Sequence, residues 1–148
     1  TSVPWSQVLE LCEKVKARIN KEHQALKLPG KPFVTARVTQ IYDTGACVYF
    51  YLGVSYKGVN NPTQTFKVIE DAARDEILSC GGSLSHHHGI GKLRQHFLPE
   101  IMSETLLKWN ALVKEAVDPQ NVFGVGNLYP VAELAPKAGG NAKAGGNV

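Results

Sequence analysis

Two stretches of β-forming residues, separated by a short turn sequence, constrain the fold of this 148-residue chain most strongly. Residues 46–56 are dense in β-branched and aromatic side chains, which favour strands. Residues 33–40 read as a second strand, and Asp43-Thr44-Gly45 between them is a turn signal. We therefore expect an antiparallel pair of strands.

The stronger strand has two different faces, because side chains alternate across a strand. The aliphatic face, which suits a core packed against helices, carries Val48, Phe50, Leu52 and Val54. The opposite face carries Cys47, Tyr49, Tyr51 and Gly53. Its phenol hydroxyls suit a wall that meets a ligand, although strand tyrosines are often packing residues with a satisfied hydroxyl.

Three helical regions are expected around this pair of strands. The first opens near Pro4, ends before Leu28, and repeats apolar residues at Val8, Leu11, Cys12, Val15 and Ile19. The second begins at Asn61-Pro62, with Asn61 as N-cap, stops at Gly81-Gly82, and buries Phe66, Ile69, Ala73 and Ile77. The third starts near Lys92, breaks at Pro99, ends at Asp118, and has an apolar stripe of Leu106, Trp109, Val113 and Val117.

Composition excludes several classes of function. Hydrophobic residues make up 43% and charged residues 20%, as in soluble globular domains. The net charge is +3, and the basic residues are scattered among acidic ones without a dense cluster, which disfavours binding to nucleic acid. The odd count and wide spacing of the cysteines at Cys12, Cys47 and Cys80 do not suggest a disulfide framework or a zinc knuckle, so we expect free thiols. No run of residues is long enough to span a membrane, and no signal peptide is recognisable.

Three consecutive histidines, His86, His87 and His88, are the sharpest chemical feature. Each imidazole must satisfy two ring nitrogens, and its ordinary pKa near neutrality suits proton transfer. The sequence predicts a short strand that runs into a tight loop at Gly89, with His87 facing away from its two neighbours. Gly89 and Gly91 would let a flat or phosphorylated ligand approach the backbone.

Other interpretations of the triplet stay open. It could belong to an expression tag, to a hydrogen-bonded structural cluster or to a metal site. Metal is disfavoured because neighbours on a strand point apart and no carboxylate or cysteine sits at ligand spacing. Lys92 and Arg94 could bind phosphate or an anionic flavin group, or could simply be a solvated helix start.

The segment Gly81-Gly82-Ser83-Leu84-Ser85-His86-His87-His88-Gly89-Ile90-Gly91-Lys92-Leu93-Arg94 resembles the His-rich signature of the alkyldihydroxyacetonephosphate synthase family. Further similarity covers nearly everything from Thr1 to about Leu128, including Arg37-Val38-Thr39-Gln40, Tyr42-Asp43, Gly45-Ala46-Cys47 and Tyr49-Phe50-Tyr51. The family belongs to the vanillyl-alcohol-oxidase superfamily of flavoproteins.

The resemblance implies an α+β fold, in which helices cover an antiparallel sheet, as the cap domain of such a flavoprotein. The fold would be incomplete without an N-terminal FAD-binding domain, and we expect the chain to be a fragment that is inactive alone. The implied organisation is a cap domain at residues 1–118, a segment at 119–130 that returns towards the flavin, and a flexible low-complexity tail at 131–148.

The resemblance also implies a reaction without net redox change. The acyl group of acyl-dihydroxyacetone phosphate is exchanged for a long-chain fatty alcohol, which forms the ether bond of ether lipids, with FAD as cofactor. Tyr49, His86, His87 and His88 match the family's catalytic residues, whereas His88, Gly89 and Asn127 are predicted to contact the cofactor, and no metal is expected. A peroxisomal location, a homodimer and peripheral membrane contact are further expectations, although the last residues are no Ser-Lys-Leu address.

Two alternatives remain. His88-Gly89-Ile90-Gly91 also resembles FAD-dependent D-2-hydroxy-acid dehydrogenases, which typically carry an acidic residue where this chain has His87. A fragment without its flavin domain could also be a non-catalytic protein that binds lipid or a partner.

Overall fold

The computed structural model describes residues 1–128, so the predicted tail at 131–148 lies outside the described residues. The chain forms two compact units, Thr1–Gly89 and a second unit from Ile90 onward. The predicted boundary at residue 118 stays a prediction about the whole protein.

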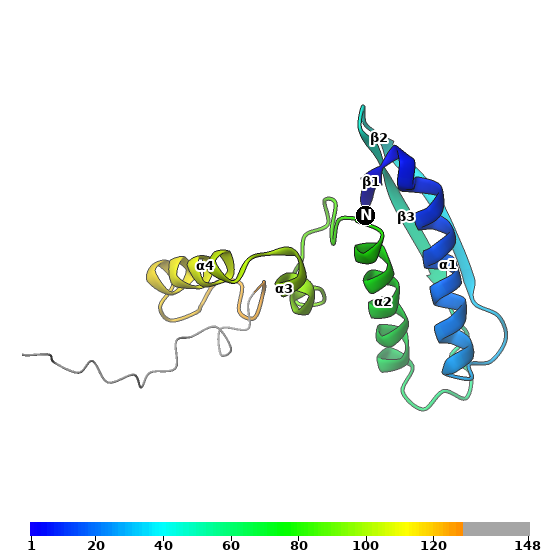
Figure 1. Ribbon diagram of the computed structural model, residues 1–148. Helices are drawn as coiled ribbons and strands as arrows, with labels where there is room; N and C mark the ends of the chain where they lie inside the picture. Colours follow the sequence, from blue (N-terminus) through cyan, green and yellow to red (C-terminus); the bar gives the residue numbers. More distant parts are fainter. Residues whose placement is uncertain (129–148) are drawn as a thin grey trace, which may run out of the picture. The chain divides into compact units, whose positions relative to one another are not determined.

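The first unit is a three-stranded antiparallel sheet with two helices (Figure 1). Its strands are β1 (Ser2–Pro4), β2 (Phe33–Ile41) and β3 (Gly45–Gly53), in the order β1-β3-β2. Its helices are α1 (Val8–Ala25), preceded by a short 3-10 turn at Trp5–Gln7, and α2 (Pro62–Ser79). The expected α+β class and the pair of strands are therefore confirmed.

The core lies between the two helices and one face of the sheet. Leu11, Val15 and Ile19 of α1 are buried, as their four-residue spacing predicts. Val48 of β3 is fully buried, and the core also includes the partly buried residues Phe50, Leu52 and Val54, so the predicted aliphatic face is confirmed.

Two expectations about the first unit are wrong in detail. Ser2–Pro4 is a strand rather than the start of a helix, because its backbone pairs with Cys47, Ala46 and Gly45 of β3. In α2, Asn61 caps the helix by accepting a hydrogen bond from the Gln64 amide, as predicted, but Phe66 is 38% exposed and not part of the buried stripe.

The second unit contains a 3-10 turn (Gln95–Phe97), α3 (Leu98–Ile101) and α4 (Glu104–Val117). The expected helix start near Lys92 and break at Pro99 are wrong, because residues 92–94 form a turn and Pro99 lies in the first turn of α3, where proline is tolerated. The interruption falls instead at Met102 and Ser103, and α4 begins at Glu104. The predicted apolar stripe of α4 is wrong, since its four members are 37% to 75% exposed and Leu107 is the buried residue of the helix.

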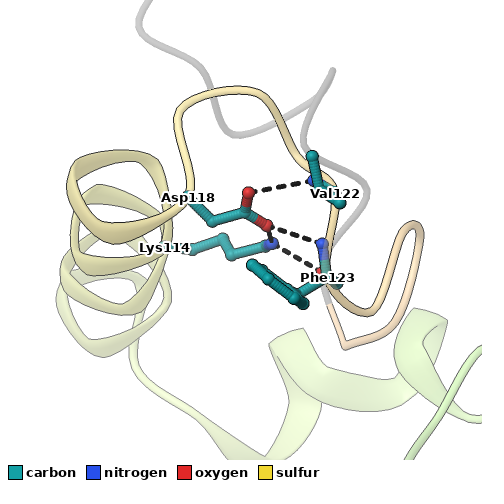
Figure 2. A network of polar contacts seen from close by, with 4 residues as sticks. All are labelled: Lys114, Asp118, Val122 and Phe123. Atoms are coloured by element: carbon teal, nitrogen blue, oxygen red, sulfur yellow. Dashed lines mark hydrogen bonds and ion pairs between the residues drawn. The ribbon is translucent and has the colours of Figure 1, made fainter.

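A carboxylate closes the turn after α4, as Figure 2 shows. Asp118 pairs with Lys114 and accepts hydrogen bonds from the backbone amides of Val122 and Phe123, both at 2.9 Å. Lys114 also donates to the carbonyl oxygen of Phe123 at 2.7 Å. The Lys114 ammonium, followed by the Val122 amide, lowers the pKa of Asp118 from 3.8 to about 2.

The three cysteines are free, as expected. No helix within residues 1–128 combines the length and the apolar composition needed to cross a bilayer.

Candidate active site

The His triplet reaches the tyrosine face of the sheet by passing the edge of β1. After α2, the Ser83 amide donates to the carbonyl oxygen of Ser2 at 3.0 Å, and Ser83 Oγ accepts from the Ser2 amide at 2.9 Å. Because α2 packs on the aliphatic face, while the triplet contacts Tyr49 on the opposite face, the chain wraps around this edge. The buried side chain of Leu84 anchors the segment.

Tyr49 is the centre of the first group of contacts. Its hydroxyl oxygen lies 2.5 Å from Nε2 of His87 and 3.0 Å from Nε2 of His88. The rings of His87 and His88 meet edge to face, with centroids 4.4 Å apart. Tyr49 is half-buried, whereas the two imidazoles are exposed, so the hydrogen-bonded group stands at the surface of the first unit.

A second group of contacts surrounds His86. Its Nε2 atom lies 2.7 Å from the hydroxyl oxygen of Tyr42 and 3.0 Å from Oε1 of Gln40. The Tyr42 hydroxyl also donates to Gln40 Oε1 at 2.8 Å. The rings of His86 and His87 are 5.1 Å apart in an edge-on arrangement, so the two groups of contacts adjoin each other.

The structure corrects the predicted conformation of the triplet. Residues 83–91 form bends and turns rather than a short strand, and His87 does not face away from its neighbours. All three rings and Tyr49 are brought together, because the chain is not extended there and alternation does not apply.

The argument against a metal also needs correction, since a cysteine does lie within reach. The sulfur of buried Cys47 and ring nitrogens of His86 and His87 all lie within 4.8 Å of one another. Ligands of a tetrahedral zinc lie roughly 3.3–3.6 Å apart, as follows from its bond lengths. These three residues could hold a soft metal ion, but Nε2 of each histidine already has a tyrosine hydroxyl as partner.

The residues predicted to contact the cofactor fall in both units. Gly89 follows the triplet with φ of 79°, and a side chain there would meet nothing within 4 Å. The direction in which a Cβ would point is therefore clear beside the exposed His87 and His88 rings, which fits the edge of a flat cofactor. Asn127, together with Lys92 and Arg94, belongs to the second unit, so their roles stay predictions.

Sequence reasoning missed Gln40 and Tyr42, which contact His86, and Arg37, which lies beside Tyr49 in the sheet. Arg37 pairs directly with Tyr49 across the strands, so its side chain shares that face. All three lie in segments that carry the family resemblance, which was the available signal. Alternation could not place Gln40, because a bulge interrupts β2 between Val38 and Gln40.

The fold and this polar face belong to a known class of domain. Residues 1–128 match the family model described as "FAD linked oxidases, C-terminal domain". The chain belongs to this family, whose cofactor is FAD, and is thus part of an FAD-linked enzyme family.

Within the family, the chain is similar to proteins named alkyldihydroxyacetonephosphate synthase. It is 44% identical to the one from Caenorhabditis elegans over 128 residues, which are 86% of this chain and 21% of that protein. Identity to the one from Dictyostelium discoideum is 25% over 88% of the chain and 21% of that protein. An uncharacterized FAD-linked oxidoreductase, YgcU of Escherichia coli (strain K12), is 29% identical over 85% of the chain and 26% of its own length. The chain therefore spans about a fifth to a quarter of these relatives.

Proposed function

We propose that this chain supplies the proton-transferring side chains in the active site of an FAD-dependent alkylglycerone-phosphate synthase. The enzyme would exchange the acyl group of acyl-dihydroxyacetone phosphate for a long-chain fatty alcohol. The observation that supports it best is the Tyr49 hydroxyl, held between Nε2 of His87 and Nε2 of His88. The 44% identity to a relative named for this activity supplies the substrate class.

The Tyr49 hydroxyl carries a single proton, so it donates to at most one of the two histidines and accepts from at least one. In the arrangement that suits a relay, one of the two Nε2 atoms carries a lone pair and the other carries a hydrogen. Such a chain can give a proton to a substrate oxygen from one group and refill it from the next. It can also run in the opposite direction without a net change of charge.

The exchange of substituents needs this kind of relay. One C–O bond to the fatty acid breaks and one C–O bond to the alcohol forms, with no net oxidation. The entering alcohol loses a proton, and the departing carboxylate can take up a proton to leave as the fatty acid. Both steps therefore call for acid–base groups. Tyr49, His87 and His88 would transfer these protons. His86, whose ring adjoins that of His87, would act as a further acid–base group.

FAD fits the open side of this group. His88 and Gly89 would contact it, because the ring is exposed and no side chain fills the space at Gly89. When bound, FAD supplies the electronic chemistry that lets one substituent leave the substrate carbon before the other adds. Asn127 is proposed as a further contact of the cofactor in the whole protein.

Other properties of the whole protein are proposed from the family resemblance. They are a peroxisomal location, a homodimer and peripheral contact with the membrane that holds the fatty alcohol. The rival function is oxidation of a D-2-hydroxy acid, which the similarity to an FAD-linked oxidoreductase favours. The position before His88 argues against it, since His87 stands where those enzymes carry an acid.

One assay separates the two functions. The full-length protein that contains this chain, loaded with FAD, is incubated with acyl-dihydroxyacetone phosphate and a deuterated long-chain alcohol. Mass spectrometry should detect the deuterated ether and release of fatty acid. A parallel reaction with D-lactate and a dye acceptor should leave the dye oxidised. Dye reduction without ether formation would overturn the proposal in favour of the dehydrogenase.

A further inference from the structure

Three polar atoms around His86 form a closed triangle. They are Oε1 of Gln40, the hydroxyl oxygen of Tyr42 and Nε2 of His86, and each pair is separated by 2.7–3.0 Å. Each pair of atoms at this distance needs a hydrogen directed between them, because facing lone pairs repel, although one hydrogen can be shared between two acceptors. The number of protons available therefore determines the protonation of the imidazole.

The contact between Gln40 and His86 determines which ring nitrogen of His86 carries the proton. An amide oxygen carries no hydrogen and only accepts, so the 3.0 Å contact is a hydrogen bond only if Nε2 of His86 carries the proton. The Tyr42 hydroxyl then donates to the same amide oxygen, and the one hydrogen on Nε2 is shared between that oxygen and the Tyr42 hydroxyl oxygen. With the proton on Nδ1 instead, the single hydrogen of Tyr42 would have to serve all three sides.

A bulge in β2 brings Gln40 to this place. Val38 pairs with Val48 on the core face, whereas Gln40, rather than Thr39, pairs with Cys47. The extra residue, Thr39, shifts the alternation by one position and turns Gln40 to the face shared by Cys47 and Tyr49. Without the extra residue, Gln40 would pair with Ala46 and face the core.

The hairpin that follows places Tyr42. Its amide donates to the carbonyl oxygen of Gly45 at 2.8 Å, which closes the turn through Asp43 and Thr44. The indole of Trp5, the residue that follows β1, donates to the carbonyl oxygen of Tyr42 at 2.9 Å and also fixes the position of Tyr42. Both partners of His86 are thus fixed by the backbone of the sheet.

We propose that Gln40 and Tyr42 are positioning residues that hold His86 as the Nε2-protonated tautomer. Neutral His86 then has its lone pair on Nδ1, and this atom is its proton acceptor. In contrast, His87 and His88 contact the Tyr49 hydroxyl through Nε2. The triplet is divided into a relay of two histidines and a separately oriented third. Only the use of His86 in catalysis rests on the proposed function; its tautomer does not.

The test is a nitrogen NMR measurement on the 148-residue chain with isotope-labelled histidine. Long-range proton–nitrogen spectra well above the ordinary histidine pKa of about 6.5 distinguish a protonated ring nitrogen from one with a lone pair. The His86 signals are assigned by their loss in His86→Gln. We expect a protonated Nε2 and a bare Nδ1. A bare Nε2 would mean that the Gln40 amide is turned around, and would overturn the proposal.

A substitution at Gln40 gives a second readout. Gln40→Glu places a carboxylate against Nε2–H and should raise the His86 pKa by about 1 unit or more, since an opposite charge favours the imidazolium. Gln64→Glu, at an exposed position of α2, is the matched control and should leave it unchanged. An unchanged pKa in Gln40→Glu would contradict the contact. If the full-length protein lacked transferase activity, only the proposed function would fail, because neither NMR result depends on turnover.

Discussion

Gly45 is the position where one added methyl group should most disturb the first unit. A Cβ atom there would lie 2.2 Å from the carbonyl oxygen of Val3 and 2.9 Å from its carbonyl carbon. Ordinary C···O contacts begin at about 3.3 Å, so β1 would have to move by roughly 1 Å. The obstructing atoms are backbone and cannot rotate away.

The cost follows from what β1 contributes. Val3 is 4% exposed, and burial of a valine side chain is worth about 1.5–3 kcal/mol. The hydrogen bonds between Ser2 and Ser83 add about 1 kcal/mol each if they are lost. Partial displacement of β1 should therefore lower the free energy of unfolding by about 2–4 kcal/mol in Gly45→Ala. It should also loosen the start of the His segment.

Urea unfolding followed by tryptophan fluorescence measures this loss. The chain has two tryptophans, and Trp109 is 62% exposed, so a Trp109→Phe background leaves Trp5 as the reporter of the first unit. Gly53→Ala, at the other end of β3, is the matched control, because its Cβ would meet only Phe33 Cβ at 3.8 Å. Equal stability of the Gly45→Ala and Gly53→Ala variants would refute the reasoning.

Two further predictions concern the core and the turn after α4. Leu11→Ala removes a fully buried side chain and should cost about 2–5 kcal/mol, whereas Leu9→Ala, at a position that is 70% exposed, should stay within about 0.5 kcal/mol in the same urea assay. The pKa of Asp118 is lowered from 3.8 to about 2, so its stabilising effect is complete above about pH 4 and is lost as the pH falls through 2. The protection of the Val122 and Phe123 amides against hydrogen exchange, taken relative to the intrinsic rate at each pH, should fall over that range. Asp118→Asn should show low protection already at pH 5, and well-protected amides in this variant would contradict the network.

Local pattern predicts much of the first unit, because its elements are amphipathic. The spacing of Leu11, Val15 and Ile19 predicts the buried face of α1, and Asn61-Pro62 predicts the start of α2. Pattern failed at Ser2–Pro4, since pairing with a distant strand overrides the helical preference of Pro4 in a first turn.

The candidate site was predicted only in part, for a related reason. The residue types pointed to Tyr49 and the triplet, but Gln40 and Tyr42 depend on a bulge and a hairpin that bring distant residues together. The stripe of α4 failed for another reason. Periodicity finds an apolar face, but it does not say whether residues 1–128 contain a partner that covers it.

The hydroxyl of Tyr49 is the atom on which the proton-transfer account depends. The direct measurement compares turnover of the full-length, FAD-loaded protein in Tyr49→Phe and Tyr51→Phe, with flavin absorbance as a check on cofactor content. Tyr51 lies on the same face of β3 and is 44% exposed, so it controls for loss of a phenol from this surface. We predict that Tyr49→Phe lowers the transfer rate by about 10²–10⁴-fold, the usual contribution of a positioned acid–base group, while Tyr51→Phe stays close to the unmodified protein. Similar rates in the two variants, with flavin retained in both, would contradict the account.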